Sequence, residues 1–262
     1  MKVLPSAAGS AAVSLVALAG IPLVKPGDDL GRLIAEHLDP ACALGDRDIL
    51  VVTHKVVSKA EGRFVDLSTV RPGARAQELA AAVHKDPRLV EVILWDAAQV
   101  LRAVPGVLIV QHRLGFISAN AGVDRSNVAG PHSSLVLRLP SDPDRSARQL
   151  RQRLRELTGA RPAVVISDSH GRPWREGTVG VAIGVAGMAP VQDLRGVPDL
   201  FGYPLQITTV GFADQVAAAA SLVTGQAAEG LPVVLVRGLA YPPDEDASAR
   251  QILRPPAADL FR

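Results

Sequence analysis

Short apolar runs rich in valine and isoleucine recur along the chain, separated by segments that carry charged residues and glycine. Runs of this length and composition, bounded by turn-forming residues, are typical of β-strands. They predict strands over residues 13–18, 48–53, 106–112, 163–167, 179–187, 205–210 and 232–238.

Between these runs, apolar residues recur at intervals of three and four, the spacing that predicts amphipathic helices. Helices are expected over residues 28–38, with Asp28 or Asp29 as N-cap, over 142–159, ending at Gly159, and over 213–225, which is rich in small residues. The apolar faces consist of Leu30, Leu33, Ile34 and Leu38 in the first helix and of Ala147, Leu150, Leu154 and Leu157 in the second. Because strands and helices alternate irregularly, the pattern predicts an α+β or mixed α/β protein.

The chain shows no internal repeat and no linker that would divide it cleanly. At roughly 150 residues per domain, its length allows one large domain or two small ones. We predict an N-terminal tail over residues 1–12, a single domain over 13–240 and a C-terminal tail over 241–262. The C-terminal tail is proline-rich and charged, and is expected to wrap over the surface.

The first 20 residues combine Lys2 with an apolar stretch and small residues, which is the outline of a secretory signal. The apolar stretch continues to Lys25, however, and residues 13–18 suit a first strand equally well. We favour the strand, with the signal peptide as the alternative. No apolar run approaches the ~18 residues that a membrane-spanning helix needs. The single cysteine, Cys42, is compatible with a reducing compartment, so the expected location is the cytoplasm.

The amino-acid composition indicates which kinds of molecule the protein is not expected to bind. Apolar residues make up 48% of the chain, which is enough for a core and excludes a disordered protein. Aromatic residues make up only 3%, which argues against stacking platforms for single-stranded nucleic acid. Because 28 basic and 26 acidic residues are mixed without a basic block, we expect neither a nucleic acid nor a membrane as partner.

The common signatures of nucleotide, zinc and serine-hydrolase sites are missing from the chain, including GxxxxGK[ST], GxGxxG, HExxH and GxSxG. Two other segments place turn-forming or basic residues after predicted strands. Residues 20–29 form a Gly/Pro-rich turn, which a simple strand-to-helix connection would also explain. Residues 53–63 contain His54, Lys55, Lys59 and Arg63, which suit an anionic ligand or, alternatively, a solvated charged face.

A third segment, residues 119–128, is dense in side-chain oxygens from Asn120, Asp124, Ser126 and Asn127. Asx-type turns would account for such a stretch. A hard cation such as Mg²⁺ would also select one carboxylate surrounded by neutral oxygens.

In a fourth segment, Asp168 and Ser169 directly follow an apolar strand, where a carboxylate must be paired, capping or ligating. Arg172 and Arg175 suit bidentate contacts to phosphate, with an internal Asp–Arg pair as the alternative. Adjacent residues point in different directions, so Asp168, Ser169 and His170 do not make a catalytic triad, and His170 receives no role. Together the four segments predict a site where Mg²⁺ or Mn²⁺ screens phosphates held by Lys59 and the arginines.

Seven segments in register carry a resemblance to a known family. They read GIPLVKPGDDL, VVTHKVVSKAEGR, NAGVDRSNV, LPSDPDRSARQLR, SDSHGRPWREG, VAIGVAGM and GQAAEGLPVVLVRG, in this order over residues 20–238. In these segments the chain strongly resembles the coenzyme F420-0:L-glutamate ligases, the gamma-glutamyl ligases of coenzyme F420 biosynthesis. The resemblance implies an α+β fold of mixed sheets and packed helices that is specific to the family, and not a Rossmann, P-loop or ATP-grasp fold.

The resemblance also implies a reaction. GTP would phosphorylate the terminal carboxylate of the deazaflavin precursor F420-0, and the amino group of L-glutamate would attack the acyl phosphate, so that GDP and phosphate are released. Further glutamates would be added through gamma links. Two divalent cations, Mg²⁺ or Mn²⁺, together with K⁺ and a homodimer, are implied in the same way.

Carried over by position, the resemblance assigns residues to the site. Asp124 and Asp168 would bind one metal ion, and Ser169 and Gln226 would bind the second. With Asp124 and Asp168, Lys59 is the expected catalytic group. The implied GTP contacts are Ile21, Pro22, Leu23, Val24, His54, Lys55, Lys59, Asn127, Thr224, Gly225, Gln226, Ala227, Ala228, Glu229, Gly230 and Leu231.

Three positions depart from the family pattern. Ser169 stands where threonine is usual, and it retains the hydroxyl. Gln215 stands in place of a glutamate, which removes a charge and puts any role of that position in doubt. His54 lies in a variable turn, so its contact with GTP could come from its backbone alone.

Three hypotheses about function follow. The favoured one is a GTP-dependent glutamate ligase acting on F420-0. The second is a ligase of the same family that joins a different amino acid or acceptor. The third is a nucleotide- and metal-binding module without ligase activity, against which the paired metal ligands argue.

Overall fold

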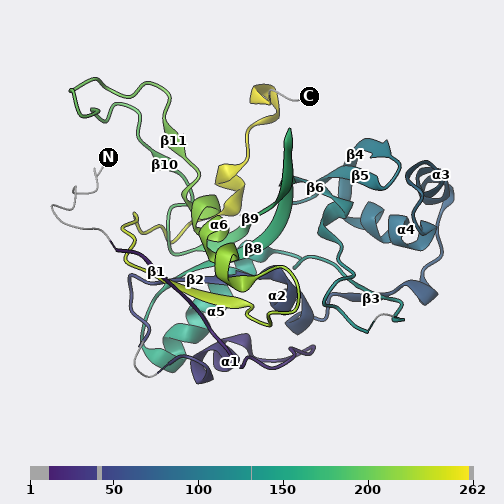
Figure 1. The fold of residues 1–262 in the computed structure, drawn as a ribbon, viewed down its shortest axis with the longest axis horizontal. Coiled ribbons are helices and arrows are strands. Elements are labelled where there is room, and N and C mark those ends of the chain that lie inside the picture. Colours follow the sequence, from purple (N-terminus) through teal and green to yellow (C-terminus); the bar gives the residue numbers. More distant parts are fainter. Residues whose placement is uncertain (1–11, 40–42, 131, 260–262) are drawn as a thin grey trace.

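The computed structural model describes residues 12–39, 43–130 and 132–259. At its centre is a five-stranded sheet with the strand order β1-β12-β2-β8-β9 (Figure 1). Neighbours β2 and β8 run parallel, and the other pairs are antiparallel. The strands are β1 (Ser14–Ala17), β2 (Ile49–Thr53), β8 (Ala163–Arg172), β9 (Arg175–Ala186) and β12 (Val233–Arg237). Mixed sheets and packed helices confirm the α+β class.

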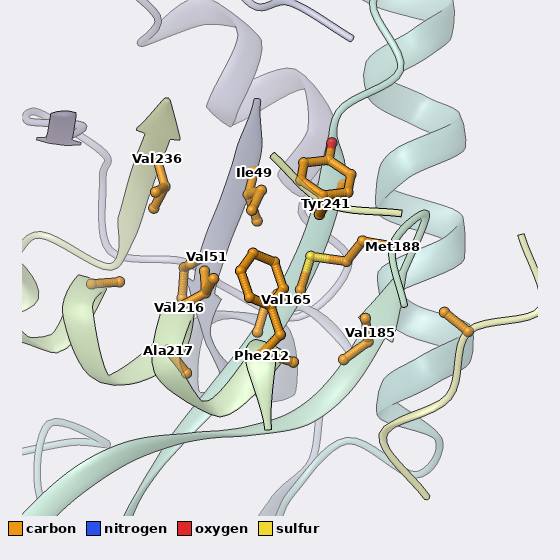
Figure 2. Packing of buried hydrophobic residues seen from close by; sticks show 14 of the residues in the cluster. Ile49, Val51, Val165, Val185, Met188, Phe212, Val216, Ala217, Val236 and Tyr241 are labelled. Atoms are coloured by element: carbon orange, nitrogen blue, oxygen red, sulfur yellow. The ribbon is translucent and has the colours of Figure 1, made fainter. Parts of the chain in front are cut away.

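Helices cover both faces of this sheet, which explains why β2 and β12 are continuous apolar runs rather than alternating ones. On one face, α6 (Phe212–Thr224) packs its Phe212, Val216 and Ala217 against the strands (Figure 2). On the other face lie α1 (Leu30–Glu36), α2 (His54–Ala60) and α5 (Pro143–Thr158).

Three of these helices, α1, α5 and α6, confirm the predicted helices closely. Helix α1 is capped by Asp29, and α5 begins after its cap Asp142 and ends at Gly159 in a left-handed conformation. Helix α2 is the exception, because residues 53–63 predict only basic groups after a strand. Its only apolar side chains larger than alanine are the adjacent Val56 and Val57, and two adjacent residues show no helical period.

A second lobe, residues 64–137, has its own apolar core built from helices α3 and α4 and from strands of two small sheets. The sequence patterns predict only one of its elements, the strand at 106–112. Its elements are β3 (Phe64–Asp66), η2 (Leu67–Thr69), α3 (Ala74–Val83), α4 (Pro87–Asp96), β4 (Ala97–Val104), β5 (Val107–His112), β6 (Ile117–Ala119), η3 (Asn120–Gly122) and β7 (Leu135–Leu137).

The predicted strand at 205–210 is wrong for residues 205–208. Only β11 (Thr209–Val210) forms, paired with β10 (Gln192–Asp193). The intervening residues 194–208, which we call the arm, extend away from the body (Figure 1). Residues 205–208 bond to residues 194–197 of the same arm through single backbone contacts, such as Leu205 N–H to the Val197 carbonyl at 2.9 Å, but without the continuous ladder that defines a strand.

Strand β1 lies near the N-terminal end of the described residues, and two short 3-10 helices lie near the C-terminal end. Strand β1 confirms a first strand within residues 13–18, whereas the predicted N-terminal tail lies outside the described residues except for residue 12. The segment after Gly238 includes η4 (Ala249–Ile252) and η5 (Pro256–Ala258), and it buries Tyr241, Ala247 and Ala249 in the core. Among the described residues, no helix is both long and apolar enough to cross a bilayer.

His112, the last residue of β5, is buried in the folded chain, and burial changes the pKa of its imidazole. Its ring is buried and stacks on Phe116 at 4.9 Å between centroids. Its Nδ1 accepts a hydrogen bond from the Leu114 N–H at 2.9 Å, and its Nε2 is buried without a partner in the described structure. Burial lowers the pKa of His112 to about 4, although the Asp96 carboxylate acts in the opposite direction.

We therefore expect the free energy of unfolding to fall as the pH is lowered from about 6.5 to about 5. The folded pKa lies below the unfolded one, so the unfolded chain binds a proton that the folded chain does not. Urea unfolding should show a loss on the order of 1–2 kcal/mol from this group. His112→Gln keeps an acceptor for Leu114 and should lose this part of the slope. Equal pH slopes in the two proteins would contradict the assignment.

Candidate functional site

The parallel pair β2–β8 brings two of the predicted site residues to one edge of the sheet. Thr53 is paired with Ser167, so both strands reach the same edge, where His54 and Asp168 come next. A bulge in the β8–β9 register lies between Ile166 and Ser167, directly before Asp168. The extra residue of this bulge is Ile183 of β9, so β8 keeps its alternation of faces through Asp168. Polar side chains beyond the carboxyl ends of parallel strands are typical of ligand sites.

Asp124 reaches the same place from the second lobe. Its backbone N–H and carbonyl both bond to Leu137, at 2.9 Å each, which fixes the residue beside β7. The turn before it contains Gly122 at φ +67°, where a Cβ would approach Leu139 Cδ1 to 2.7 Å. Glycine is therefore required there for both conformation and space.

His54, Asp124 and Asp168 form one compact cluster, in which the imidazole is the centre. His54 Nε2 lies 3.0 Å from Asp124 Oδ2 and 3.3 Å from Asp168 Oδ1, and the His54 residue is only 1% exposed. The residues of β8 that precede Asp168 are buried, and those that follow it are partly or fully exposed. Its carboxylate therefore lies at the boundary between the core and the site. Two carboxylates therefore share a single buried donor.

The charges of this cluster stabilise one another. Burial opposes a charge on His54, but Asp168 and Asp124 outweigh burial and raise the pKa of His54 to about 9. Burial also opposes a charge on the two aspartates, because it raises their pKa. Their positively charged partners together lower the pKa of each aspartate by more than burial raises it. His54 and His170 hold the pKa of Asp168 below its usual range, and His54 and Lys55 do so for Asp124.

Two lysines one turn apart on α2 add positive charge beside the cluster. Lys55 Nζ forms an ion pair with Asp124 and lies 3.4 Å from the Ser126 carbonyl oxygen. Burial, followed by the neighbouring charge of Lys55, lowers the pKa of Lys59. A half-buried ammonium beside a second one is stabilised when an anion binds between them.

The loop after α6, residues 224–231, lies against the other predicted ligands. Ser169 Oγ donates to Gln226 Oε1 at 2.9 Å, and Asn127 Nδ2 donates to the Ala227 carbonyl at 2.7 Å. Inside the loop, the Ala227 N–H donates to Glu229 at 2.8 Å. The structure thus brings together the predicted second metal pair, Ser169 and Gln226, as two neutral oxygen donors.

The predicted loop at residues 21–24 also approaches α2. The Gly27 N–H donates to the Ala60 carbonyl at 2.8 Å, which joins the turn after this loop to the end of the helix that carries Lys59. Leu23 is exposed and Val24 is buried, so the loop has one anchored residue and one available for contact.

The residues present fit a divalent cation. His54, Asp124 and Asp168 each offer one ligand atom, and these atoms lie within 4.8 Å of one another. Carboxylate oxygens suit Mg²⁺ and Mn²⁺, and imidazole nitrogen is a further donor for Mn²⁺. The metal prediction includes Asp124 and Asp168 but omits His54, which it assigns to the nucleotide. A buried histidine after a strand gives no sign in the sequence of which carboxylates it will meet.

His170 has a partner that the sequence does not reveal. Its Nε2 lies 2.9 Å from Asp168 Oδ2, because residues two apart on a strand share one face. Arg172 and Arg175, in contrast, are exposed at the far end of the β8–β9 hairpin. Arg172 donates to the Glu176 carbonyl there at 3.1 Å, and its predicted phosphate contact, like that of Arg175, stays a prediction.

Comparison with known proteins follows the same segments. The family model described as F420-0:Gamma-glutamyl ligase matches residues 20–238. A coenzyme F420:L-glutamate ligase from Methanothermobacter thermautotrophicus is 45% identical over 254 residues, which cover 95% of this chain and 99% of the relative. Another from Methanopyrus kandleri is 48% identical over 242 residues, covering 91% and 93%. A third, from Archaeoglobus fulgidus, is 41% identical over 250 residues, covering 95% and 96%.

The carboxylate cluster predicts how the protein responds to cations. Asp124→Asn and Asp168→Asn should each weaken Mn²⁺ binding at least about tenfold, because each removes one charged oxygen ligand. Electron paramagnetic resonance of free Mn²⁺ measures the bound fraction directly. Asp246→Asn removes an exposed carboxylate that is not part of the cluster and should leave the affinity for Mn²⁺ unchanged. Unaltered Mn²⁺ binding in both cluster variants would exclude these residues as ligands.

Proposed function

The chain belongs to the F420-0:gamma-glutamyl ligase family, and on that premise we propose that it joins L-glutamate to coenzyme F420-0 at the expense of GTP. A carboxylate oxygen of F420-0 attacks the γ-phosphorus, and the bond to the leaving GDP breaks. The glutamate nitrogen then attacks the acyl carbon, loses a proton and displaces phosphate. The product is an amide, and addition of further glutamates through gamma links is part of the proposal.

One observation carries this proposal: the cluster of His54, Asp124 and Asp168 lies beside two lysines and beside the Ser169–Gln226 pair. Bound there, two divalent cations would screen the charge of the γ-phosphate so that a carboxylate can approach it. Lys55 and Lys59 would hold phosphate oxygens, and Asn127 with the loop at residues 224–231 would hold the rest of the nucleotide. K⁺ is part of the proposal only through the family resemblance.

We expect purified protein, incubated with F420-0, L-glutamate, GTP and Mn²⁺, to yield products heavier by whole glutamyl residues. Mass spectrometry of the deazaflavin product measures this and counts the additions. Asp168→Asn should stay folded, because asparagine has the same shape, and should lose turnover by at least about a hundredfold. Asp246→Asn serves as the control with the same loss of charge.

The outcomes separate the competing hypotheses. An unchanged acceptor together with glutamate-dependent GDP release on another acceptor would favour the altered-acceptor ligase. GTP binding without any GDP release would favour a binding module. A folded and fully active Asp168→Asn enzyme would contradict the role given to this carboxylate.

We further propose that the protein is a homodimer in which the arm, residues 194–208, packs on a second copy. The arm is held internally, since Asp199 accepts hydrogen bonds from the Phe201 and Tyr203 N–H groups at 2.8 and 2.9 Å. Its apolar side chains nevertheless point away from the body: Leu200 is 99% exposed, Phe201 96% and Ile207 87%. An ordered loop that presents large apolar side chains to solvent is typical of a protein interface.

The double variant Leu200→Asp with Phe201→Asp should therefore shift the protein from dimer to monomer, because a buried unpaired charge opposes association. Light scattering coupled to size-exclusion chromatography measures the mass. Val107→Asp, at the exposed first residue of β5, is the control and should leave the dimer intact. A wild-type monomer at micromolar concentration would refute the dimer itself, and a dimeric double variant would refute the arm as its interface.

A further inference from the structure

A cavity of about 390 Å³ lies against the free edge of β9, next to the carboxylate cluster. Its other walls are the N-terminal turns of α5 and α6, the 3-10 helix η4 and the loop before β6. The volume falls in the range of roughly 300–1,000 Å³ that is usual for small-molecule sites. None of the residues predicted to bind GTP or metal lines it.

Three aspartates line the cavity, and in one of them both carboxylate oxygens are used by the fold. Asp142 caps α5 by accepting from the Arg145 N–H at 2.9 Å. Asp144 accepts from the Val185 N–H at 2.8 Å and from Ser248 Oγ at 2.6 Å, which ties β9 to the segment before η4. Asp144 therefore needs no ligand, and Asp142 is an exposed helix cap, whereas Asp214 is partly buried.

Asp214 differs from them. Its Oδ1 accepts from the Ala182 N–H at 2.9 Å, whereas Oδ2 accepts no hydrogen bond from any other described residue. Burial raises the pKa of this carboxyl, against the effect of the Ala182 hydrogen bond. A cation in the cavity would stabilise the ionised form.

Two arginines complete the charge pattern. Arg148 on α5 and Arg250 on η4 line the cavity, and in the part of the chain that the structure describes neither guanidinium has an ion pair or hydrogen bond. The available groups are thus two guanidiniums and one carboxylate. An acidic amino acid carries the complementary set, two carboxylates and one ammonium.

His170 separates this cavity from the cluster. Its imidazole lines the cavity and also lies 2.9 Å from Asp168 through Nε2. Phe116, another lining residue, supports the ring at 5.4 Å between centroids. A molecule in the cavity is therefore one imidazole ring away from Asp168.

We propose that this cavity binds the free L-glutamate that is ligated, with Arg148 and Arg250 on its two carboxylates and Asp214 on its ammonium. This inference rests on the proposed function, since it assigns a place to one of its substrates. The nucleotide would then occupy the side of Lys59 and the loop at residues 224–231, and the amino acid the side of His170.

Arg148→Gln, Arg250→Gln and Asp214→Asn test the inference by steady-state kinetics of GDP release. Each should raise the KM for L-glutamate at least about tenfold and leave the KM values for GTP and F420-0 within about twofold. Arg145→Gln, an exposed arginine three residues from Arg148 on α5 and outside the cavity lining, is the control and should not change the KM for glutamate. Calorimetric titration of L-glutamate into each protein measures binding without turnover.

The possible failures are distinguishable. If the variants raise the KM for F420-0 instead, the cavity serves the acceptor and the inference is wrong. If no KM changes, the cavity is not a substrate site. If the wild-type protein releases no GDP in response to glutamate, the proposed function fails, and an absence of calorimetric glutamate binding would then overturn the cavity assignment separately.

Discussion

The arrangement depends on one buried imidazole that is shared by two carboxylates. His54 follows β2, Asp168 belongs to β8 and Asp124 comes from the second lobe, so the three joined groups also join the main parts of the fold. Two adjacent carboxylates would repel each other strongly in a partly buried place, and His54 with Lys55 offsets that repulsion. A divalent cation would seek the same oxygens. To ligate such a cation through Nε2, His54 would have to release its proton, so cation binding and protonation of His54 would oppose each other.

The topology explains why such a cluster forms at this edge. β2 and β8 are the parallel pair in the sheet, so their carboxyl ends meet, and β8 continues beyond this edge, paired with β9, to carry Asp168. The third carboxylate requires the second lobe to be docked correctly. Asp124 forms backbone hydrogen bonds with Leu137. Arg138, which follows Leu137 in the chain, forms an ion pair with Asp96 at 2.5 Å. The interactions that hold Asp124 in the site therefore continue into the second lobe. The packing of the lobes is in this sense part of the site.

The elements that the sequence predicts are those whose pattern lies within one segment of the chain. Continuous Val/Ile runs predicted β2, β8 and β12, and caps with regular spacing predicted α1 and α5, because these signals lie within one segment. Helices α3 and α4 are not among the predicted elements, although Ala76, Leu79, Ala80 and Val83 of α3 follow helical spacing and α4 begins with the cap Asp86 and a proline. The strands of the second lobe that were not predicted are mostly short, and their burial depends on contacts with other segments. Asp168 stands out in the sequence as a carboxylate after an apolar strand, and Asp124 as the carboxylate of an oxygen-rich turn, but the convergence of residues 44 positions apart is a property of the assembled lobes. The partners of His54 and His170 were hidden for the same reason.

Alternation along β8 gives the site two sides. Asp168 and His170 continue the face that carries Val164 and Ile166, whereas Ser169 continues the face that carries Val165 and reaches the loop after α6. One strand thus presents oxygen donors toward the loop proposed to hold the nucleotide and an imidazole toward the cavity proposed to hold the amino acid. An acyl phosphate hydrolyses if water reaches it before the amine does. Both proposed sites lie within a few residues of Asp168, so we expect the amine to have a short way to the acyl phosphate, which favours the amine over water.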